Sequence, residues 1–191
     1  MNETEFKRIV ALYATGVAVV TVRAPTGETY GVTVSSFTSV SLEPPLILFC
    51  LSRRLSGLET FLGAPVVGVQ ILAENQTTLS DHFATGGSDR SEDSGWYEEG
   101  TTDPPFLAKS LGRMRCLPEV WYPAGDHLVV ICQVVEVEPG PLLGERGPLV
   151  YWASRYHRLA GQQVPVRLTA KTMDFWGSGE VGKGNRSAEG D

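Results

Sequence analysis

The feature that most constrains this chain is a series of short runs rich in β-branched residues, each bounded by turn residues. The runs are Val17 to Arg23, Tyr30 to Thr38, Leu46 to Leu51, Val66 to Ile71, Leu128 to Val137 and Leu149 to Trp152. Pro25-Thr26-Gly27 predicts an antiparallel hairpin between the first two runs. Strands at this spacing favour a barrel over a sheet built from βαβ units.

Helical patterns are few. An amphipathic helix is expected from about Glu3 to Ala14, because apolar residues follow helical spacing at Phe6, Ile9, Val10 and Tyr13. Two further helices are expected at Asn75 to Thr85 and Pro105 to Arg115, both between the fourth and fifth strands. We therefore expect the helices to lie at the ends of the barrel.

The chain has the size of one domain. It has 191 residues, of which 42% are hydrophobic and 20% charged, and this suits a single compact core. We expect the domain to cover residues 1–168 and a flexible C-terminal tail to cover residues 169–191, where Gly, Ser, Lys and Glu predominate. The polar stretch from Gly86 to Pro105 is predicted to be a loop, with a lid as one possible role.

Charge and composition argue against several classes of function and location. A formal net charge of -6 argues against binding to nucleic acid or to an anionic membrane. The first residues lack the pattern of a signal peptide and no apolar run approaches the roughly 20 residues of a membrane span, so we expect a cytoplasmic protein. Cys50, Cys116 and Cys132 have no CxxC spacing and are expected to be buried thiols.

Three familiar motifs fail on their context. The GxGxxG pattern from Gly177 to Gly182 has no strand before it and too little chain after it for a helix. The histidines His82, His127 and His157 have no companions at metal-ligand spacing, so no metal is expected. A hydrolase triad has no GxSxG elbow to support it.

The most informative stretch runs from Thr33 to Pro45, a strand that ends in a series of hydroxyls and then meets two prolines. One interpretation is a solvated strand end followed by a turn. The other is a ligand site, because hydroxyls and backbone NH groups can hydrogen-bond the polar edge of a flavin ring. Small side chains there would let a flat ring approach the backbone.

The order of motifs resembles the short-chain flavin reductase family, the reductase partners of two-component flavin-dependent monooxygenases. The likeness runs from about Phe6 to Leu159. Its segments are Thr15-Gly16-Val17 with Val19-Val20-Thr21, Thr33 to Pro45, Val69 to Leu72 with Gln76, Gly125-Asp126-His127, and Pro148 to Tyr151 with Arg155 to His157. Departures from the family pattern are Gln70 in place of Asn, Cys132 in place of Gly, and Ser52-Arg53-Arg54-Leu55-Ser56 after the third strand.

The resemblance implies a six-stranded antiparallel split β-barrel of Greek-key type and a homodimer with the flavin site near the subunit interface. It also implies hydride transfer from NADH or NADPH to N5 of FMN or FAD, with the reduced flavin passing to a partner monooxygenase. The choice within each cofactor pair stays open. Two other functions are also open: a flavin-retaining oxidase or oxygenase that acts directly on an organic substrate, and a non-catalytic flavin-binding protein.

Site residues follow from the resemblance one position at a time. The implied flavin contacts are Thr33, Val34, Ser35 and Ser36 along the ring edge, Ser39 and Ser41 beyond them, Cys50, Leu51, Ser52 and Ser56 beside the ribityl chain and phosphate, and Phe83 near the pocket. Arg53, with Arg54 beside it, would contact the phosphate by charge; the alternative is that both are exposed side chains with no such role. His127 is the catalytic candidate and would bind the nicotinamide or the flavin. Arg155 and Tyr156 would meet the nicotinamide from the other side. Without the family pattern, Asp126 and His127 would be read as a turn and a strand start.

Overall fold

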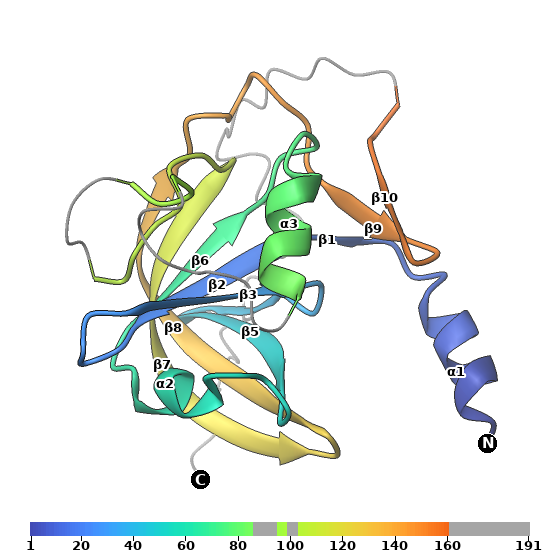
Figure 1. Cartoon of the computed structure of the whole chain (residues 1–191), viewed down its shortest axis with the longest axis horizontal. Coiled ribbons are helices and arrows are strands. Elements are labelled where there is room, and N and C mark those ends of the chain that lie inside the picture. The colour runs from blue at the N-terminus through green and yellow to red at the C-terminus, as the bar shows by residue number, and fades with distance from the viewer. Residues whose placement is uncertain (86–94, 99–102, 161–191) are drawn as a thin grey trace, which may run out of the picture.

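Antiparallel strands are the main secondary structure of the protein, seen in a computed structural model that describes residues 1–85, 95–98 and 103–160 (Figure 1). The strands are β1 (Thr15–Gly16), β2 (Ala18–Arg23), β3 (Thr29–Val34), β4 (Thr38–Leu42), β5 (Pro45–Ser52), β6 (Val67–Ile71), β7 (Gly112–Ala124), β8 (His127–Pro139), β9 (Val150–Trp152) and β10 (Arg155–His157). The helices are α1 (Glu3–Val10), α2 (Leu58–Gly63) and α3 (Thr77–Ala84). The expected tail, residues 169–191, lies outside the described residues.

The main sheet curls back on itself. Its seven strands run in the order β3-β2-β6-β7-β8-β5-β4, and a smaller sheet has the order β1-β9-β10. The two edge strands of the main sheet, β3 and β4, are separated in sequence only by residues 35–37. Opposite edges can be joined by so short a connection only if the sheet is rolled. Rolling brings β3 against β5, the neighbour of β4, and we call the line where β3 and β5 meet the seam.

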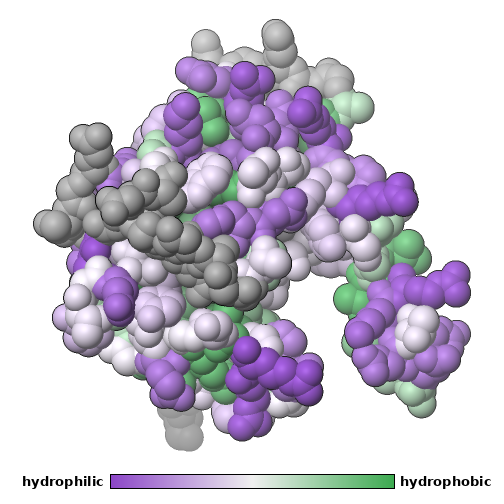
Figure 2. Space-filling view, viewed as in Figure 1, coloured by the Kyte–Doolittle hydropathy of each residue, from purple (hydrophilic) through white to green (hydrophobic). Residues whose placement is uncertain are grey.

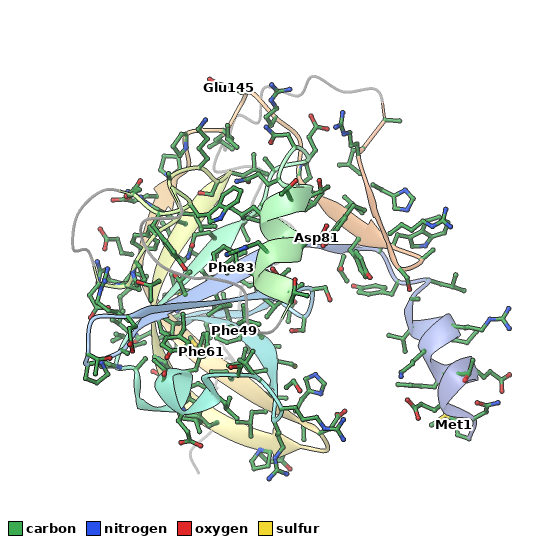
Figure 3. All side chains as sticks on the ribbon, viewed as in Figure 1. Met1, Phe49, Phe61, Asp81, Phe83 and Glu145 are labelled. Carbon is green, nitrogen blue, oxygen red and sulfur yellow. The ribbon has the colours of Figure 1, made fainter. Side chains whose placement is uncertain are left out.

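Two apolar clusters lie on opposite faces of β2, whose residues are nearly all buried. Ala18, Val20 and Val22 face the barrel interior, where Phe49 and Phe61 also pack. Val19 faces the other way, into a second cluster that contains Phe83 of α3 (Figure 3). The helix α3 is therefore held on the outside of the barrel by its own apolar core.

The structure confirms the mainly β, antiparallel barrel class and the hairpin of β2 and β3. The helices predicted at the N-terminus and after Asn75 are present as α1 and α3, although α1 ends at Val10. The predicted strand from Tyr30 to Thr38 is two strands, because the chain turns at residues 35–37. The number of strands consequently exceeds the six that were expected.

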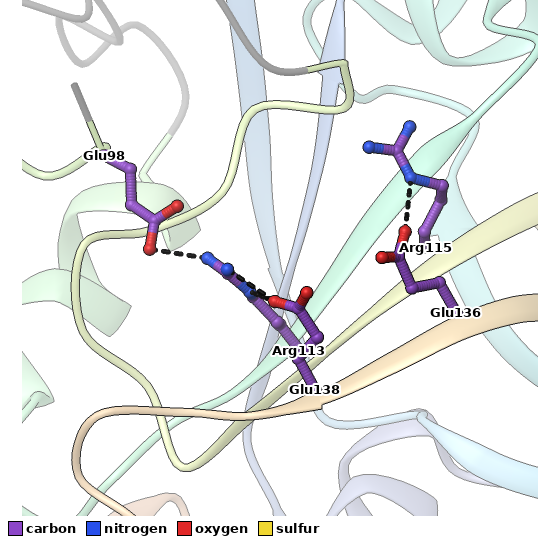
Figure 4. Close-up of polar contacts among 5 residues, drawn as sticks. All are labelled: Glu98, Arg113, Arg115, Glu136 and Glu138. Atoms are coloured by element: carbon purple, nitrogen blue, oxygen red, sulfur yellow. Dashed lines mark hydrogen bonds and ion pairs between the residues drawn. The ribbon is translucent and has the colours of Figure 1, made fainter. Parts of the chain in front are cut away.

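The predicted helix from Pro105 to Arg115 is wrong. Residues from Gly112 onward form β7, the longest strand together with β8. Within β7, Met114 and Cys116 pack toward the core while Arg113 pairs with Glu138 of β8 through a 2.5 Å ion pair (Figure 4). This alternation has the two-residue period of a strand, and opposite charges across the strands stabilise the pairing.

The described part of the stretch from Gly86 to Pro105 is attached to the body rather than free. Tyr97 is only 5% exposed and packs edge-on against Phe83, so this polar stretch places one of its side chains in an apolar core. Glu98 forms a 2.5 Å ion pair with Arg113 (Figure 4). Among the described helices, none is long and apolar enough to cross a membrane.

The contact between α3 and the barrel predicts a stability difference between two glycines. A Cβ at Gly31 would lie 2.6 Å from the Phe83 ring, whereas one at Gly63 would meet nothing within 4 Å. We expect Gly31→Ala to lower the free energy of unfolding by about 1–3 kcal/mol through overpacking, and Gly63→Ala to leave it nearly unchanged. Urea unfolding of both variants measures this, and equal midpoints would contradict the packing described.

Candidate functional site

A pocket of about 410 Å³ opens beside the seam between β3 and β5, within the range of about 300–1,000 Å³ usual for small-molecule sites. Nine of the predicted site residues line it: Thr33, Val34, Ser35, Ser36, Cys50, Leu51, Ser52, Ser56 and His127. The segments that carry them are far apart in the sequence. The rolled sheet brings these segments together at one place.

Ser36 joins the two sides of the seam. Its Oγ accepts a hydrogen bond from the Cys50 backbone N–H at 2.8 Å and lies 3.5 Å from the Cys50 carbonyl. Since β3 and β5 are not neighbours in the sheet, this hydroxyl replaces part of a missing strand ladder. Ser36 therefore shapes the pocket wall, and its hydroxyl is already engaged within the protein.

Thr33 connects the pocket to α3. Its hydroxyl donates to the Ser80 carbonyl at 2.7 Å. On the other side of the helix, the Tyr156 hydroxyl lies 2.9 Å from both Ser80 Oγ and Asp81 Oδ1, and burial together with the nearby Asp81 charge raises the pKa of Tyr156. Tyr156 does not line the pocket, but one residue, Ser80, links it to the Thr33 wall.

His127 is placed by a two-residue turn between β7 and β8. Gly125 has φ +64°, the left-handed conformation that glycine adopts without strain. The Arg53 N–H donates to the Asp126 carbonyl at 2.9 Å, and His127 pairs with Ser52 of β5. The turn is thus tied to the strand that forms the other side of the pocket.

The side chains of Asp126 and His127 form a pair. His127 Nδ1 lies 2.8 Å from Asp126 Oδ1, and this hydrogen bond, with the charge of the imidazole, lowers the pKa of the Asp126 carboxyl. A carboxylate that accepts from Nδ1–H fixes the ring tautomer, which leaves Nε2 to meet a ligand.

Arg54 supplies positive charge at the pocket. Of the two arginines considered for the phosphate, Arg54 lines the pocket and Arg53 does not. Ser52 Oγ accepts a hydrogen bond from the Arg54 N–H at 3.2 Å, which orders the turn after β5. An arginine in a hydroxyl-rich turn can bind the oxygens of a phosphate.

Several predicted residues lie elsewhere in the structure. Ser39 and Ser41 are on β4, paired with the far part of β5, and the Ser41 hydroxyl accepts from the Glu43 N–H. Phe83 is buried in the second apolar cluster, and its neighbour Ala84 lines the pocket instead. Arg155 is exposed on β10. The proposed contacts of these residues with a cofactor stay predictions.

Three lining residues were not predicted: Val32, Leu55 and Ala84. Val32 is two residues before Val34 on the same strand face, so strand alternation was a usable signal for it. Ala84 had no such signal, because only the docking of α3 brings it to the seam.

The lining fits a flat, anionic ligand. The half-buried Val32 and Leu55 provide apolar contact area, hydroxyls provide hydrogen-bonding groups, and Arg54 and His127 provide cationic or donor groups at the rim. A flavin combines a planar ring, a polar edge and a phosphate, so the residues present suit it. Within the described residues, no group of three or more His, Cys, Asp or Glu side chains could hold a metal ion.

The rolled sheet and the seam pocket define a split-barrel protein whose pocket lining suits a planar phosphorylated ligand. A family model described as "Flavin reductase like domain" matches residues 10–160. The chain belongs to this flavin reductase family.

Similar proteins support this family assignment. The chain is 39% identical over 155 residues to the reductase component of 4-hydroxyphenylacetate 3-monooxygenase from Thermus thermophilus, covering 81% of this chain and 95% of that protein. It is 35% identical to a flavin reductase (NADH) from Kitasatospora aureofaciens, covering 88% of this chain and 87% of that one. It also spans 54% of a longer Sinorhizobium meliloti 1021 protein, with a TM-score of 0.75 and 29% identity over 83% of this chain.

One relative of known structure contains fragments of both NAD and FAD. The NADH:FAD oxidoreductase SgcE6 of Streptomyces globisporus C-1027, in complex with NAD and FAD fragments, has a TM-score of 0.75 and 28% identity to this chain. The alignment covers 84% of this chain and 94% of that one.

The thiols give a direct test of the pocket. Burial raises the pKa of Cys116 and of Cys132 to about 12, so at pH 8 a fraction of only about 10⁻⁴ of either is thiolate, the reactive form. Cys50 is half-buried and lines the pocket. We expect a maleimide to label Cys50 first in the native protein and all three thiols after unfolding. Peptide mass spectrometry measures this, and early labelling of Cys116 or Cys132 would contradict it.

Proposed function

We propose that this protein reduces FMN or FAD with NAD(P)H and releases the reduced flavin to a partner monooxygenase. The observation that carries the proposal is the convergence of the Ser36 seam, the Arg54 turn and His127 on one pocket, in a chain that belongs to the flavin reductase family. A bound flavin supplies the hydride-accepting atom, N5. The protein's own task is to bind and orient the two nucleotides.

The residues divide this task between two walls. Val34, Ser35 and Leu51 would contact the ring and its polar edge, and Arg54 would hold the phosphate. His127 would direct its Nε2 toward the nicotinamide carboxamide or the flavin, with Nδ1 held by Asp126. Hydride transfer needs no proton abstraction, so His127 acts in this proposal by orientation and not as an obligatory base.

The wider assignments belong to the same proposal. Reductase components among the relatives support a monooxygenase as the recipient of the reduced flavin. We also propose a homodimer, a cytoplasmic location and one domain over residues 1–168. Support for NADH as the donor comes from relatives named as NADH-dependent, one an FMN reductase and another an FAD reductase.

Nicotinamide oxidation tests the activity. Purified protein would be mixed with NADH or NADPH, with and without added FMN or FAD, and the nicotinamide absorbance followed. Oxidation that depends on added flavin supports the proposal and identifies both cofactors. Tight flavin retention with little oxidation would instead support the flavin-retaining oxygenase or the non-catalytic binding protein.

Two adjacent arginines provide a matched pair for flavin binding. Arg54 lines the pocket, whereas Arg53 does not, although both are exposed and carry the same charge. We expect Arg54→Ala to weaken FMN binding about 10-fold, as loss of one charge-assisted phosphate contact would, and Arg53→Ala to weaken it less than about 2-fold. Fluorescence titration with FMN measures both. The reverse order would assign the phosphate contact to Arg53.

His127→Ala separates nicotinamide binding from flavin binding. We expect it to raise the Michaelis constant for NADH or slow flavin reduction by about 10-fold or more, because the nicotinamide loses an orienting contact. Flavin affinity should stay nearly unchanged, which serves as the internal control. Stopped-flow reduction and flavin titration of the same preparation measure the two effects. Unchanged kinetics would remove His127 from the site.

A further inference from the structure

The helix α1 stands apart from the rest of the protein. Figure 2 shows it as a separate lobe with open space between it and the body, and none of its residues is buried. Phe6, Ile9, Val10 and Tyr13, which we call the α1 stripe, are 51%, 64%, 53% and 77% exposed. An eight-residue helix is marginal in water without a packing surface, so an uncovered apolar stripe of this kind indicates a partner.

The direction of α1 is set by a fixed joint. The Ala153 N–H donates to the Ala11 carbonyl at 2.8 Å, and Trp152 Nε1 donates to the Leu12 carbonyl at 3.0 Å. Both bonds attach the end of α1 to the hairpin of β9 and β10. The joint thus presents the stripe away from the chain's own core.

The same chain carries a second uncovered apolar surface. Residues paired directly across antiparallel strands share a face, and two such rows lie on the outside of the barrel: Leu48, Ile131 and Val120, then Leu46, Gln133 and Leu117. We call these two rows the outer face. Val120 is 43% and Leu117 39% exposed, and the other four residues are half-buried.

The two surfaces suit each other. The outer face has no charged residue, and its one polar side chain is Gln133. On α1, Glu3 lies three residues before Phe6 and seven before Val10, so its ion pair with Lys7 borders the stripe. A contact centred on Ile9 and Tyr13 therefore places no unpaired charge against the outer face. The four side chains, three on α1 and Tyr13 just after it, supply less than the roughly 800 Å² that each partner of a stable complex buries. Reciprocal packing uses the stripe and the outer face of each copy, which doubles the contact.

We propose that α1 is an exchanged arm, whose stripe packs on the outer face of a second copy of this chain while the second copy's arm does the same in return. Such a contact is self-complementary, as a two-fold dimer requires. The proposal rests on the homodimer proposed above and adds the element that holds it together.

Two aspartate substitutions on α1 test the arm. Ile9→Asp places a charge within the stripe, and Thr4→Asp places the same charge on the opposite face of the helix. Both residues are exposed, so neither variant should affect folding of the barrel. We expect Ile9→Asp to weaken the dimer at least about 100-fold, since a two-fold contact is changed twice, and Thr4→Asp to leave it unchanged. Sedimentation equilibrium measures both.

Cross-linking identifies the surface that α1 contacts. ¹⁵N-labelled Ile9→Cys protein and unlabelled Val120→Cys protein would be mixed until native mass spectrometry shows subunit exchange, and then treated with a short bismaleimide. We expect a cross-linked peptide that joins a labelled to an unlabelled chain through the two new cysteines. Each variant alone controls for reaction at Cys50. Absence of the mixed peptide from exchanged dimers would overturn the arm.

The outcomes separate the arm from the dimer. If the unchanged protein is a monomer, both the arm and the homodimer fail, and another segment of the same chain must cover the stripe. If Ile9→Asp leaves a dimer as tight as the unchanged protein, the arm fails while the homodimer stands. Flavin-dependent NADH oxidation by the unchanged protein is measured separately and decides the activity whatever the result for the arm.

Discussion

The hydroxyl of Ser36 joins two strands that share no ladder, and much of the structure depends on the seam it closes. Because β3 and β5 are not paired, the main sheet can roll without sealing, and the Cys50 backbone N–H needs the partner that Ser36 Oγ provides. A sealed barrel would have no opening at this point. A flat sheet would keep β3 and β5 apart with four strands between them, and no pocket would form.

Three anchors hold the seam in a fixed shape. Thr33 attaches one wall to the Ser80 carbonyl of α3, and the Arg53 N–H attaches the turn of Asp126 to the other wall. Tyr156 holds α3 from the far side at the Ser80 hydroxyl. The bonds of Thr33 and Tyr156 lie in partly buried places, where hydrogen bonds are costly to leave unmade. The side chains placed to contact a ligand are therefore held in position by residues that do not themselves contact it.

Much of the fold and much of the site were predictable, for different reasons. Strand alternation and the Pro25 to Gly27 turn predicted the barrel class, and the hydroxyl run after Thr33 predicted one pocket wall. The strand β7 was missed because Arg113 and Arg115 look like a helix surface until Glu138 and Glu136 face them (Figure 4). Which of Arg53 and Arg54 lines the pocket depends on the geometry of the turn after β5, which no local sequence pattern predicts. Ala84 depends on how a helix docks.

The long hairpin of β7 and β8 contains two irregularities that cancel. One extra residue, Glu119, lies on β7 and one, Val135, lies on β8, so both strands have 13 residues and the register at Ala124 and His127 is regular. A single uncompensated bulge would turn the following side chains to the other face. In evolutionary terms, these two places can absorb an insertion matched by another on the facing strand, whereas the Gly125 turn cannot change length without moving His127. Insertions and deletions among proteins descended from this chain should therefore occur along the two strands of the hairpin and not at its Gly125 turn.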